Sequence, residues 1–177
     1  VFPFDAPQPP LVSSLSVDPT DESRVAITTT EAVYLSTDAG AAWTRLDVKE
    51  PLRPNDQLTC VALSPNDAAV AGGPSFHGFF ETSDHGAHWI DLAERIAVMQ
   101  LGGGNYEEVN AVAYSPVDPD LVYFSLGFGR GLFAMRRGAR TAERLALPAG
   151  RRELAITDIA FREAPDGGGW LLEVRTD

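Results

Sequence analysis

Six residues could bind a ligand, because their side chains stack or hydrogen-bond and lie in turns and connections between apolar runs. They are Phe76, His77, Tyr106, Glu107, Phe128 and Arg130. Aromatic rings stack on sugar rings and on apolar protein surfaces, while imidazole, carboxylate and guanidinium groups form hydrogen bonds that orient a ligand. These residues therefore predict a surface that binds a protein or a glycan, without a cofactor.

The sequence gives little support for catalytic residues. Glu107 and Glu108 offer two carboxylates, but neighbouring residues in a strand point to opposite faces, so they cannot form the acid/base pair of a glycosidase by themselves. Cys60, the only cysteine, lies in an apolar run and is expected to be a small buried hydrophobe. Gly102–Gly104 is not followed by the Lys and Ser/Thr of a phosphate-binding loop. No catalytic residue and no metal site is predicted.

The charge of the chain limits its partners. The 177 residues carry a net charge of −11, which argues against nucleic acid, because binding of a phosphate backbone needs a basic face. The basic residues gather between positions 130 and 152, where seven Arg accompany a single acid, Glu143. This stretch is either a solvated edge or a docking patch for an acidic partner. No apolar run approaches the roughly 20 residues of a membrane span.

A turn motif occurs twice and organises the chain. Residues 36–43 and 82–89 both read Ser/Thr-x-Asp-x-Gly-x-x-Trp, each after an apolar run. The Asp carboxylate can accept hydrogen bonds from backbone N–H groups of a turn, the Gly permits a positive φ, and the Trp returns to the apolar side. The residues expected to have this structural role are Ser36, Asp38, Gly40, Trp43, Thr82, Asp84, Gly86 and Trp89.

This motif resembles the Asp-box, or bacterial neuraminidase repeat, of β-propellers. Such propellers include sialidases, sortilin-type receptors, xyloglucan-active glycoside hydrolases and photosystem II assembly factors. The segment Ala113–Tyr123 and the run Gly131–Phe133 are similar to the blades of the xyloglucanases. The resemblance implies a propeller fold and an extracytoplasmic, bacterial protein that is periplasmic, secreted or surface-anchored. It does not imply one chemistry, because these relatives share the turn and not a function.

The spacing of apolar runs supports the same fold class. The corners Leu15-Ser16, Leu63-Ser64 and Tyr114-Ser115 recur at a period of about 48 residues. Each unit contains four short strand-like runs, among them 42–48, 88–92, 109–114 and 121–126. We therefore expect an all-β protein with four-stranded antiparallel blades. The expected division is an N-terminal arm at 1–10, blade 1 at 11–48, blade 2 at 49–92, blade 3 at 93–148 and the first half of blade 4 at 149–177.

About 3.5 blades cannot close, because an open propeller exposes strand edges. The chain is thus expected to be half of a seven-bladed propeller, completed by residues beyond Asp177, by a separately cleaved chain or by a partner subunit. Val1–Phe4 has no basic segment and no initiating Met, so any signal peptide is expected to have been removed or left out. The third unit keeps Gly138 but lacks the Ser, Asp and Trp, which predicts a hairpin without its cap.

The predicted function is that of a non-catalytic extracytoplasmic binding module. In a four-stranded blade the turns between strands three and four share one face with the corners between strands one and two, so the two Asp motifs lie away from the six candidate ligand-binding residues. The alternative is the propeller fragment of a glycoside hydrolase of the xyloglucanase or sialidase type. The xyloglucanases take their two catalytic carboxylates from two propellers, and this chain offers part of one.

Overall fold

The protein is all-β in the computed structural model, and the description covers most of the chain. The described residues are 11–29, 32–46, 48, 58–65, 69–72, 79–102, 105–106, 108–127, 129–147 and 155–176. The expected N-terminal arm, residues 1–10, therefore lies outside them.

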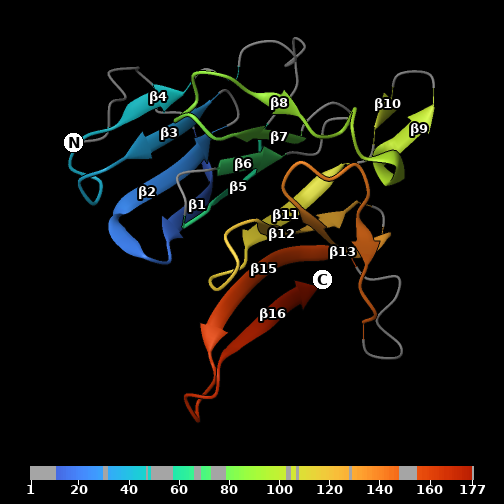
Figure 1. The fold of residues 1–177 in the computed structure, drawn as a ribbon. Coiled ribbons are helices and arrows are strands. Elements are labelled where there is room, and N and C mark those ends of the chain that lie inside the picture. The colour runs from blue at the N-terminus through green and yellow to red at the C-terminus, as the bar shows by residue number, and fades with distance from the viewer. Residues whose placement is uncertain are drawn as a thin grey trace.

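Three four-stranded antiparallel sheets follow one another along the chain, each with its strands in sequence order (Figure 1). Sheet 1 contains β1 (Val12–Asp18), β2 (Asp21–Thr29), β3 (Val33–Ser36) and β4 (Thr44–Leu46). Sheet 2 contains β5 (Cys60–Leu63), β6 (Ala69–Gly72), β7 (Phe79–Thr82) and β8 (Ile90–Asp91). Sheet 3 contains β11 (Val109–Tyr114), β12 (Leu121–Leu126), β13 (Gly131–Arg136) and β14 (Glu143–Arg144).

Two smaller elements complete the described fold. Sheet 4 has two described strands, β15 (Ile156–Glu163) and β16 (Trp170–Thr176), which form a long hairpin. Between sheets 2 and 3, the short helix η1 (Ala97–Met99) leads into a small hairpin of β9 (Gln100–Gly102) and β10 (Asn105–Tyr106). The sequence pattern of this segment predicts only a long connection, so the hairpin was not expected.

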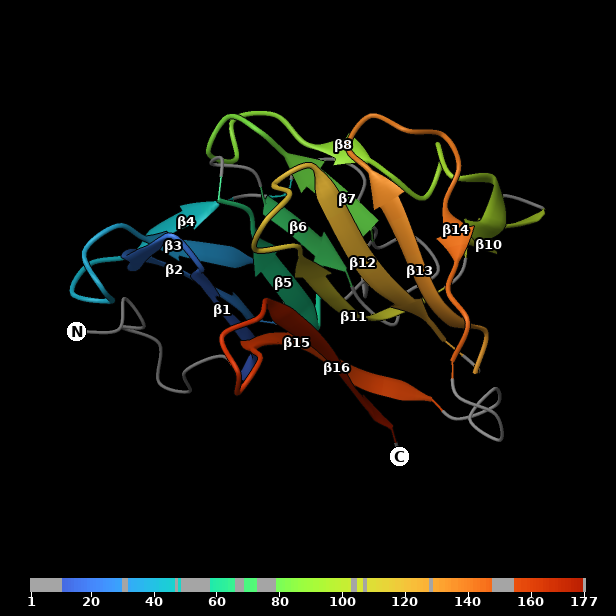
Figure 2. The ribbon, with the colours of Figure 1, turned by 60° about the horizontal axis from the view of Figure 1, so that its bottom comes forward.

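The first strands of the four sheets, β1, β5, β11 and β15, lie around a common axis, while β4, β8 and β14 lie at the outer rim (Figure 2). The hydroxyl oxygens of Ser14 and Ser16 accept hydrogen bonds from the backbone N–H groups of Val61 and Leu63, at 3.3 and 3.0 Å. From the first bonded pair to the second, the residue number rises by two in both strands, so β1 and β5 run parallel. The seam between these strands is thus closed by serine side chains rather than by a backbone ladder.

Apolar side chains fill the spaces between successive sheets. Phe80 of β7 packs with Val33 and Leu46 of sheet 1. Phe79 of β7 packs with Phe124 of β12, with ring centroids 5.1 Å apart, and both side chains are fully buried. A third cluster, which includes Leu132 of sheet 3 and Ile159 of sheet 4, joins these two sheets. Because the core consists of the layers between sheets, each sheet depends on its neighbour for burial.

A buried ion pair connects the corners of the sheets. The carboxylate of Asp18, at the end of β1, pairs with the guanidinium of Arg24 in β2, and it also accepts two 2.8 Å hydrogen bonds from the backbone N–H and hydroxyl of Thr20. Arg24 reaches the carbonyl of Ser64, and the hydroxyl of Ser64 donates to the carbonyl of Pro119 at 2.8 Å. These contacts link the corners of sheets 1, 2 and 3.

A second buried polar pair lies between sheets 2 and 3. The hydroxyl of Tyr114 donates to the carboxylate of Glu81 at 3.1 Å, and both residues are buried. Burial raises the pKa of Glu81 above its ordinary value and outweighs the hydrogen bond from Tyr114, which lowers it. Burial also raises the pKa of Tyr114, as does the neighbouring carboxylate.

This raised pKa predicts a pH dependence of stability. A carboxyl group with a raised native pKa binds its proton more tightly in the folded than in the unfolded state, so its contribution favours folding in acid and is lost as the pH rises above its ordinary pKa of 4.5. Glu81→Gln should therefore match the wild type in acid and exceed its stability at neutral pH. Urea midpoints across this range measure the effect, with the exposed Glu143→Gln as control. An equal pH slope in both variants would contradict it.

Both copies of the repeated motif form the same turn. The hydroxyls of Ser36 and Thr82 donate to the carboxylates of Asp38 and Asp84 at 2.8 and 2.9 Å. Each carboxylate also accepts a backbone N–H four residues later, at 2.8 and 2.9 Å. Hydrogen bonds from the backbone N–H and then the side chain of His88 lower the pKa of Asp84 to about 2. The Asp carboxylates therefore bind the turn backbone, as the motif predicts.

Gly86, in the second copy of the motif, and Gly138, the glycine kept in the third unit, have different surroundings. Gly86 has a φ of 85°, and a Cβ there would lie 3.0 Å from two side-chain atoms of Leu46, whereas Gly138 has a φ of 75° with nothing within 4 Å. Gly138→Ala should cost about 1 kcal/mol for the left-handed backbone. Gly86→Ala should cost about 1–3 kcal/mol more, because it overpacks the contact between sheets 1 and 2. Equal urea midpoints for the two variants would refute this difference.

Candidate functional site

The six residues predicted to bind a ligand are only partly described by the structure. Phe76, His77, Glu107 and Phe128 lie outside the described residues, and only the backbone of Tyr106 is described, in β10. Arg130 is exposed in the turn before β13, where its N–H donates to the carbonyl of Gly127. The predicted surface thus remains a prediction.

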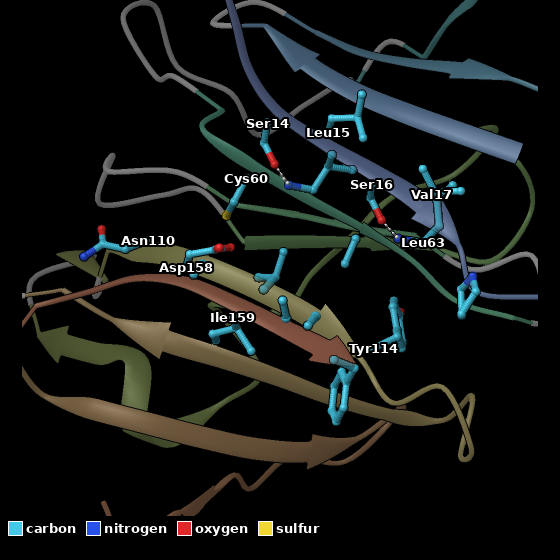
Figure 3. Close-up of a pocket in the computed structure, with 18 of the residues that line it drawn as sticks. Ser14, Leu15, Ser16, Val17, Cys60, Leu63, Asn110, Tyr114, Asp158 and Ile159 are labelled. Atoms are coloured by element: carbon cyan, nitrogen blue, oxygen red, sulfur yellow. Dashed lines mark hydrogen bonds between the residues drawn. The ribbon is translucent and has the colours of Figure 1, made fainter. Parts of the chain in front are cut away.

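The described residues instead form a pocket along the axis, with a volume of about 540 Å³ (Figure 3). The four first strands, β1, β5, β11 and β15, form its walls. Each strand contributes residues along its length, from Ser13 to Val17 in β1 and from Thr157 to Phe161 in β15. The pocket exists because every sheet begins with the strand nearest the axis.

Polarity changes along this pocket. Ser14, Asn110 and Asp158 lie near the beginnings of their strands and close to one end of the pocket (Figure 3). Leu63 and Tyr114 lie at the other end, where the strands finish. The polar end is the one at which the connections between sheets lead into the first strands, and Glu107 is two residues before Val109, the first residue of β11. The pocket therefore opens with hydrogen-bonding groups toward the face where the ligand-binding surface is expected.

The polar end has a limited range of chemistry. Asp158 is the only carboxylate among the described residues that line the pocket, and it lies 3.5 Å from the guanidinium of Arg175. The thiol of Cys60 is buried and donates to the carbonyl of Val109 at 3.7 Å. Hydroxyl, amide and carboxylate groups together can accept and donate hydrogen bonds to a peptide backbone or to sugar hydroxyls.

Ser14, Asn110 and Asp158 were not among the ligand-binding residues predicted from the sequence. A signal was available, because the three are polar residues in the first strand of their units, and successive ones lie 96 and 48 residues apart, which matches the period of about 48 residues. Strand alternation alone does not separate a residue that faces the axis from one that faces solvent, so the shared position in the repeat was the informative feature.

The basic stretch that begins at Arg130 is partly neutralised. Arg136 pairs with Asp118 at 2.7 Å, and Arg137 pairs with Asp120, so two of its guanidiniums bind the corner of their own sheet. Arg140 and Arg144 are exposed, and Arg151 and Arg152 lie outside the described residues. Any acidic partner would therefore meet Arg140 and Arg144 more readily than the paired arginines.

No family model matches the chain, and no curated protein is similar to it in sequence. Solved structures do share its fold. A structure of YCF48 bound to a D1 peptide is 15% identical, with a TM-score of 0.58 over 99% of this chain and 50% of that one. The GH74 xyloglucanase from Xanthomonas campestris is 20% identical, with a TM-score of 0.60 over 92% and 26%. A chain of the nidogen/laminin complex is 13% identical, with a TM-score of 0.61 over 86% and 53%.

The chain is an open, partial β-propeller. It spans about half or less of the length of these structures, and its four-stranded antiparallel sheets are the blades that the sequence predicts. At these identities the likeness establishes the fold of the propeller and not its activity. Within the described residues, no helix is long and apolar enough to cross a membrane.

Proposed function

We propose that this propeller is a non-catalytic, extracytoplasmic binding module whose axial pocket holds part of a protein or a glycan. The polar end of the pocket supports this proposal, because Ser14, Asn110 and Asp158, from three different strands, line it. A single described carboxylate suits recognition better than hydrolysis, since glycosidases of the common type use two. Phe76, His77, Tyr106, Glu107, Phe128 and Arg130, which the sequence predicts to bind a ligand, are further candidates for contact with it.

Two of the similar structures contain a bound peptide or protein. One is YCF48 with a D1 peptide, and the other is the nidogen/laminin complex. By analogy, a protein segment is the first ligand class to test for this propeller. In the active form, further strands complete the open array of blades. They come from a continuation of this chain, from a separately cleaved chain or from a partner subunit.

The test compares two aspartates on peptide and glycan arrays. Asp158→Asn and Asn110→Ala should weaken binding of the selected ligand about tenfold each, because a hydrogen-bonding group that lines the pocket is lost. Asp166→Asn, in the exposed turn of sheet 4, should leave binding unchanged. Equal binding by Asp158→Asn and Asp166→Asn would refute the axial pocket as the site.

The second candidate is a fragment of a glycoside hydrolase. The GH74 xyloglucanase, the most identical of the three structures above, favours this alternative. Incubation with xyloglucan oligosaccharides, followed by chromatography of the products, separates the two functions. Any hydrolysis that depends on Asp158 would overturn the non-catalytic proposal.

A further inference from the structure

A small pocket lies between the two copies of the turn motif, at residues 36–43 and 82–89. It has a volume of about 260 Å³ and shares no lining residue with the axial pocket. Sheets 1 and 2 lie side by side, and all four strands of each are described, so the pocket lies between two complete blades (Figure 1). The second motif turn contributes His85. Sheet 1 and the first motif turn contribute Leu35, Thr37, Asp38, Ala42, Thr44 and Leu46.

The pocket continues the apolar layer between sheets 1 and 2. Leu35 of β3 pairs with Thr44 of β4, and Leu46 follows two residues later, so these three side chains share the face that turns toward sheet 2. Leu35 and Leu46 are buried, whereas Thr44 is exposed. The second motif turn lies against the same strand, because a Cβ on Gly86 would come within 3.0 Å of Leu46. This contact brings His85 to the pocket beside the first motif turn.

One oxygen of the Asp38 carboxylate differs in its surroundings from its counterpart in the second copy. Oδ1 of Asp38 accepts hydrogen bonds from the N–H of Ala42 and the hydroxyl of Ser36, and these bonds, that of Ala42 first, lower its pKa. Oδ2 has no side-chain partner among the described residues. In the second copy, Oδ2 of Asp84 lies 2.6 Å from Nδ1 of His88. Ala42 stands at the position of His88, so a small side chain leaves room beside Asp38.

The other polar groups of the pocket are acceptors for a donor ligand. The hydroxyls of Thr37 and Thr44 and the imidazole of His85 form none of the hydrogen bonds found within the described part of the chain. A hydroxyl and a neutral imidazole each have a lone pair for an incoming N–H. The neighbouring base in β4, Arg45, alternates with Thr44 and therefore lies on the opposite face of the strand. Asp38 is thus the formal charge that a ligand meets in this pocket.

The surroundings of the pocket are acidic. The N–H of Ala39 donates to the carbonyl of Ser23 at 2.8 Å, which joins the first motif turn to the beginning of β2. Asp21 and Glu22, the first two residues of β2, are exposed. The chain as a whole carries a net charge of −11. The field around the pocket therefore favours a cation over an anion.

The chemistry of the pocket fits the side chain of lysine. Its methylene groups can pack on the two leucines, and its ammonium group donates three hydrogen bonds to separate acceptors. The planar fork of arginine pairs best with both oxygens of a carboxylate, but Oδ1 of Asp38 already accepts two hydrogen bonds from its own turn. The described residues that line the pocket include no aromatic ring on which a sugar would stack.

We propose that this pocket binds a lysine side chain of a partner protein, with the ammonium group on Oδ2 of Asp38 and the methylene groups on Leu35 and Leu46. Thr37, Thr44 and His85 supply the remaining acceptors. The site is formed by two neighbouring blades, because the carboxylate comes from the first motif turn and the imidazole from the second. It is separate from the axial pocket, so it does not depend on the function proposed above.

The probe is N-acetyl-lysine N-methylamide, titrated into the isotopically labelled protein and followed by two-dimensional NMR. The amide signals of Thr44 and His85 should shift and saturate, while those of β11 should not move. The arginine analogue should bind at least about threefold more weakly, and the uncharged norleucine analogue should produce no saturable shift. No saturable shift with the lysine analogue, or equal binding of the norleucine analogue, would overturn the proposal. Saturable shifts at Thr44 and His85 with a methyl glycoside alone would also overturn it and assign the pocket to a glycan.

Two variants exchange residues between the copies of the motif, so each turn receives a residue that the other already contains. Ala42→His introduces the imidazole of the second copy beside Asp38 and should weaken binding at least about tenfold. His85→Ala introduces the residue found at Ala39, whose φ of 55° is close to the 57° of His85, and should weaken binding about threefold. Unchanged binding by Ala42→His would refute the pocket as the site.

A matched pair of aspartate variants tests the role of the charge. Asp38→Asn keeps an oxygen for the turn hydrogen bonds and removes the charge, so it should weaken binding about tenfold. Asp84→Asn makes the same change in the second copy, beside His88, and should leave binding unchanged. Asp158→Asn, in the axial pocket, should also leave binding unchanged. Equal effects of Asp38→Asn and Asp84→Asn would contradict the proposal.

Discussion

An Asp18→Ala variant should lose about 3–5 kcal/mol of unfolding free energy, because it removes the buried carboxylate that pairs with the guanidinium of Arg24. Asp18 is 1% exposed and Arg24 is 8% exposed, so water cannot replace the missing carboxylate. The variant also loses both hydrogen bonds from Thr20, which hold the corner after β1. Urea unfolding followed by circular dichroism measures the change in midpoint and slope.

Two further variants give this prediction its control. Asp120→Ala removes the partner of Arg137 at the equivalent corner of sheet 3, but that pair is exposed and should contribute less than about 1 kcal/mol. The double variant Asp18→Ala/Arg24→Met should recover part of the loss, because no unpaired charge remains buried. Equal stability of Asp18→Ala and Asp120→Ala would contradict the larger contribution to the unfolding free energy that is predicted for the buried pair.

Phe124→Ala should also cost about 3–5 kcal/mol, since it opens a cavity between sheets 2 and 3. Its ring is fully buried, with centroids 5.1 Å from Phe79 and 5.7 Å from Phe133. The loss should appear in both sheets at once, so hydrogen exchange should accelerate in β7 as well as in β12.

The comparison for Phe124 is Phe161 in β15. Phe161 is only half-buried and contacts Tyr123 edge-to-face at 5.3 Å. Phe161→Ala should therefore cost clearly less than Phe124→Ala, and its effect should be confined to sheets 3 and 4. If Phe161→Ala were as destabilising as Phe124→Ala, the apolar layer between sheets 2 and 3 would not contribute more to stability than the layer between sheets 3 and 4.

The apolar patterns of the sequence predict the inner strands well and the outer strands less well. The predicted bounds of β11 and β12 agree with the structure, since these strands are apolar and packed. The fourth strand of sheet 1 was expected from Ala42 but begins at Thr44, and that of sheet 2 was expected from His88 but begins at Ile90. The backbone N–H groups of Ala42 and His88 bind the Asp carboxylates and are therefore unavailable to the ladder.

The residues that line the axial pocket were harder to predict from the sequence than the strands. Chemistry-bearing residues such as Phe76 and His77 attract attention by their types, but they lie outside the described residues. Asn110 and Asp158 are unremarkable in type and become notable only when four strands from distant repeats converge on one axis. Such convergence depends on the order of strands within each sheet, which a local pattern does not encode.

The serine side chains between β1 and β5 bear on how a chain built from such repeats can gain or lose one. Ser14 and Ser16 join two blades through side chains, so the backbone ladder of each blade ends within its own repeat. A whole repeat can then be gained or lost without breaking a ladder, provided that the new neighbour offers small hydroxyl residues and a matching apolar layer. The contact between the first two blades thus depends on two serines and a few apolar side chains rather than on a continuous backbone ladder.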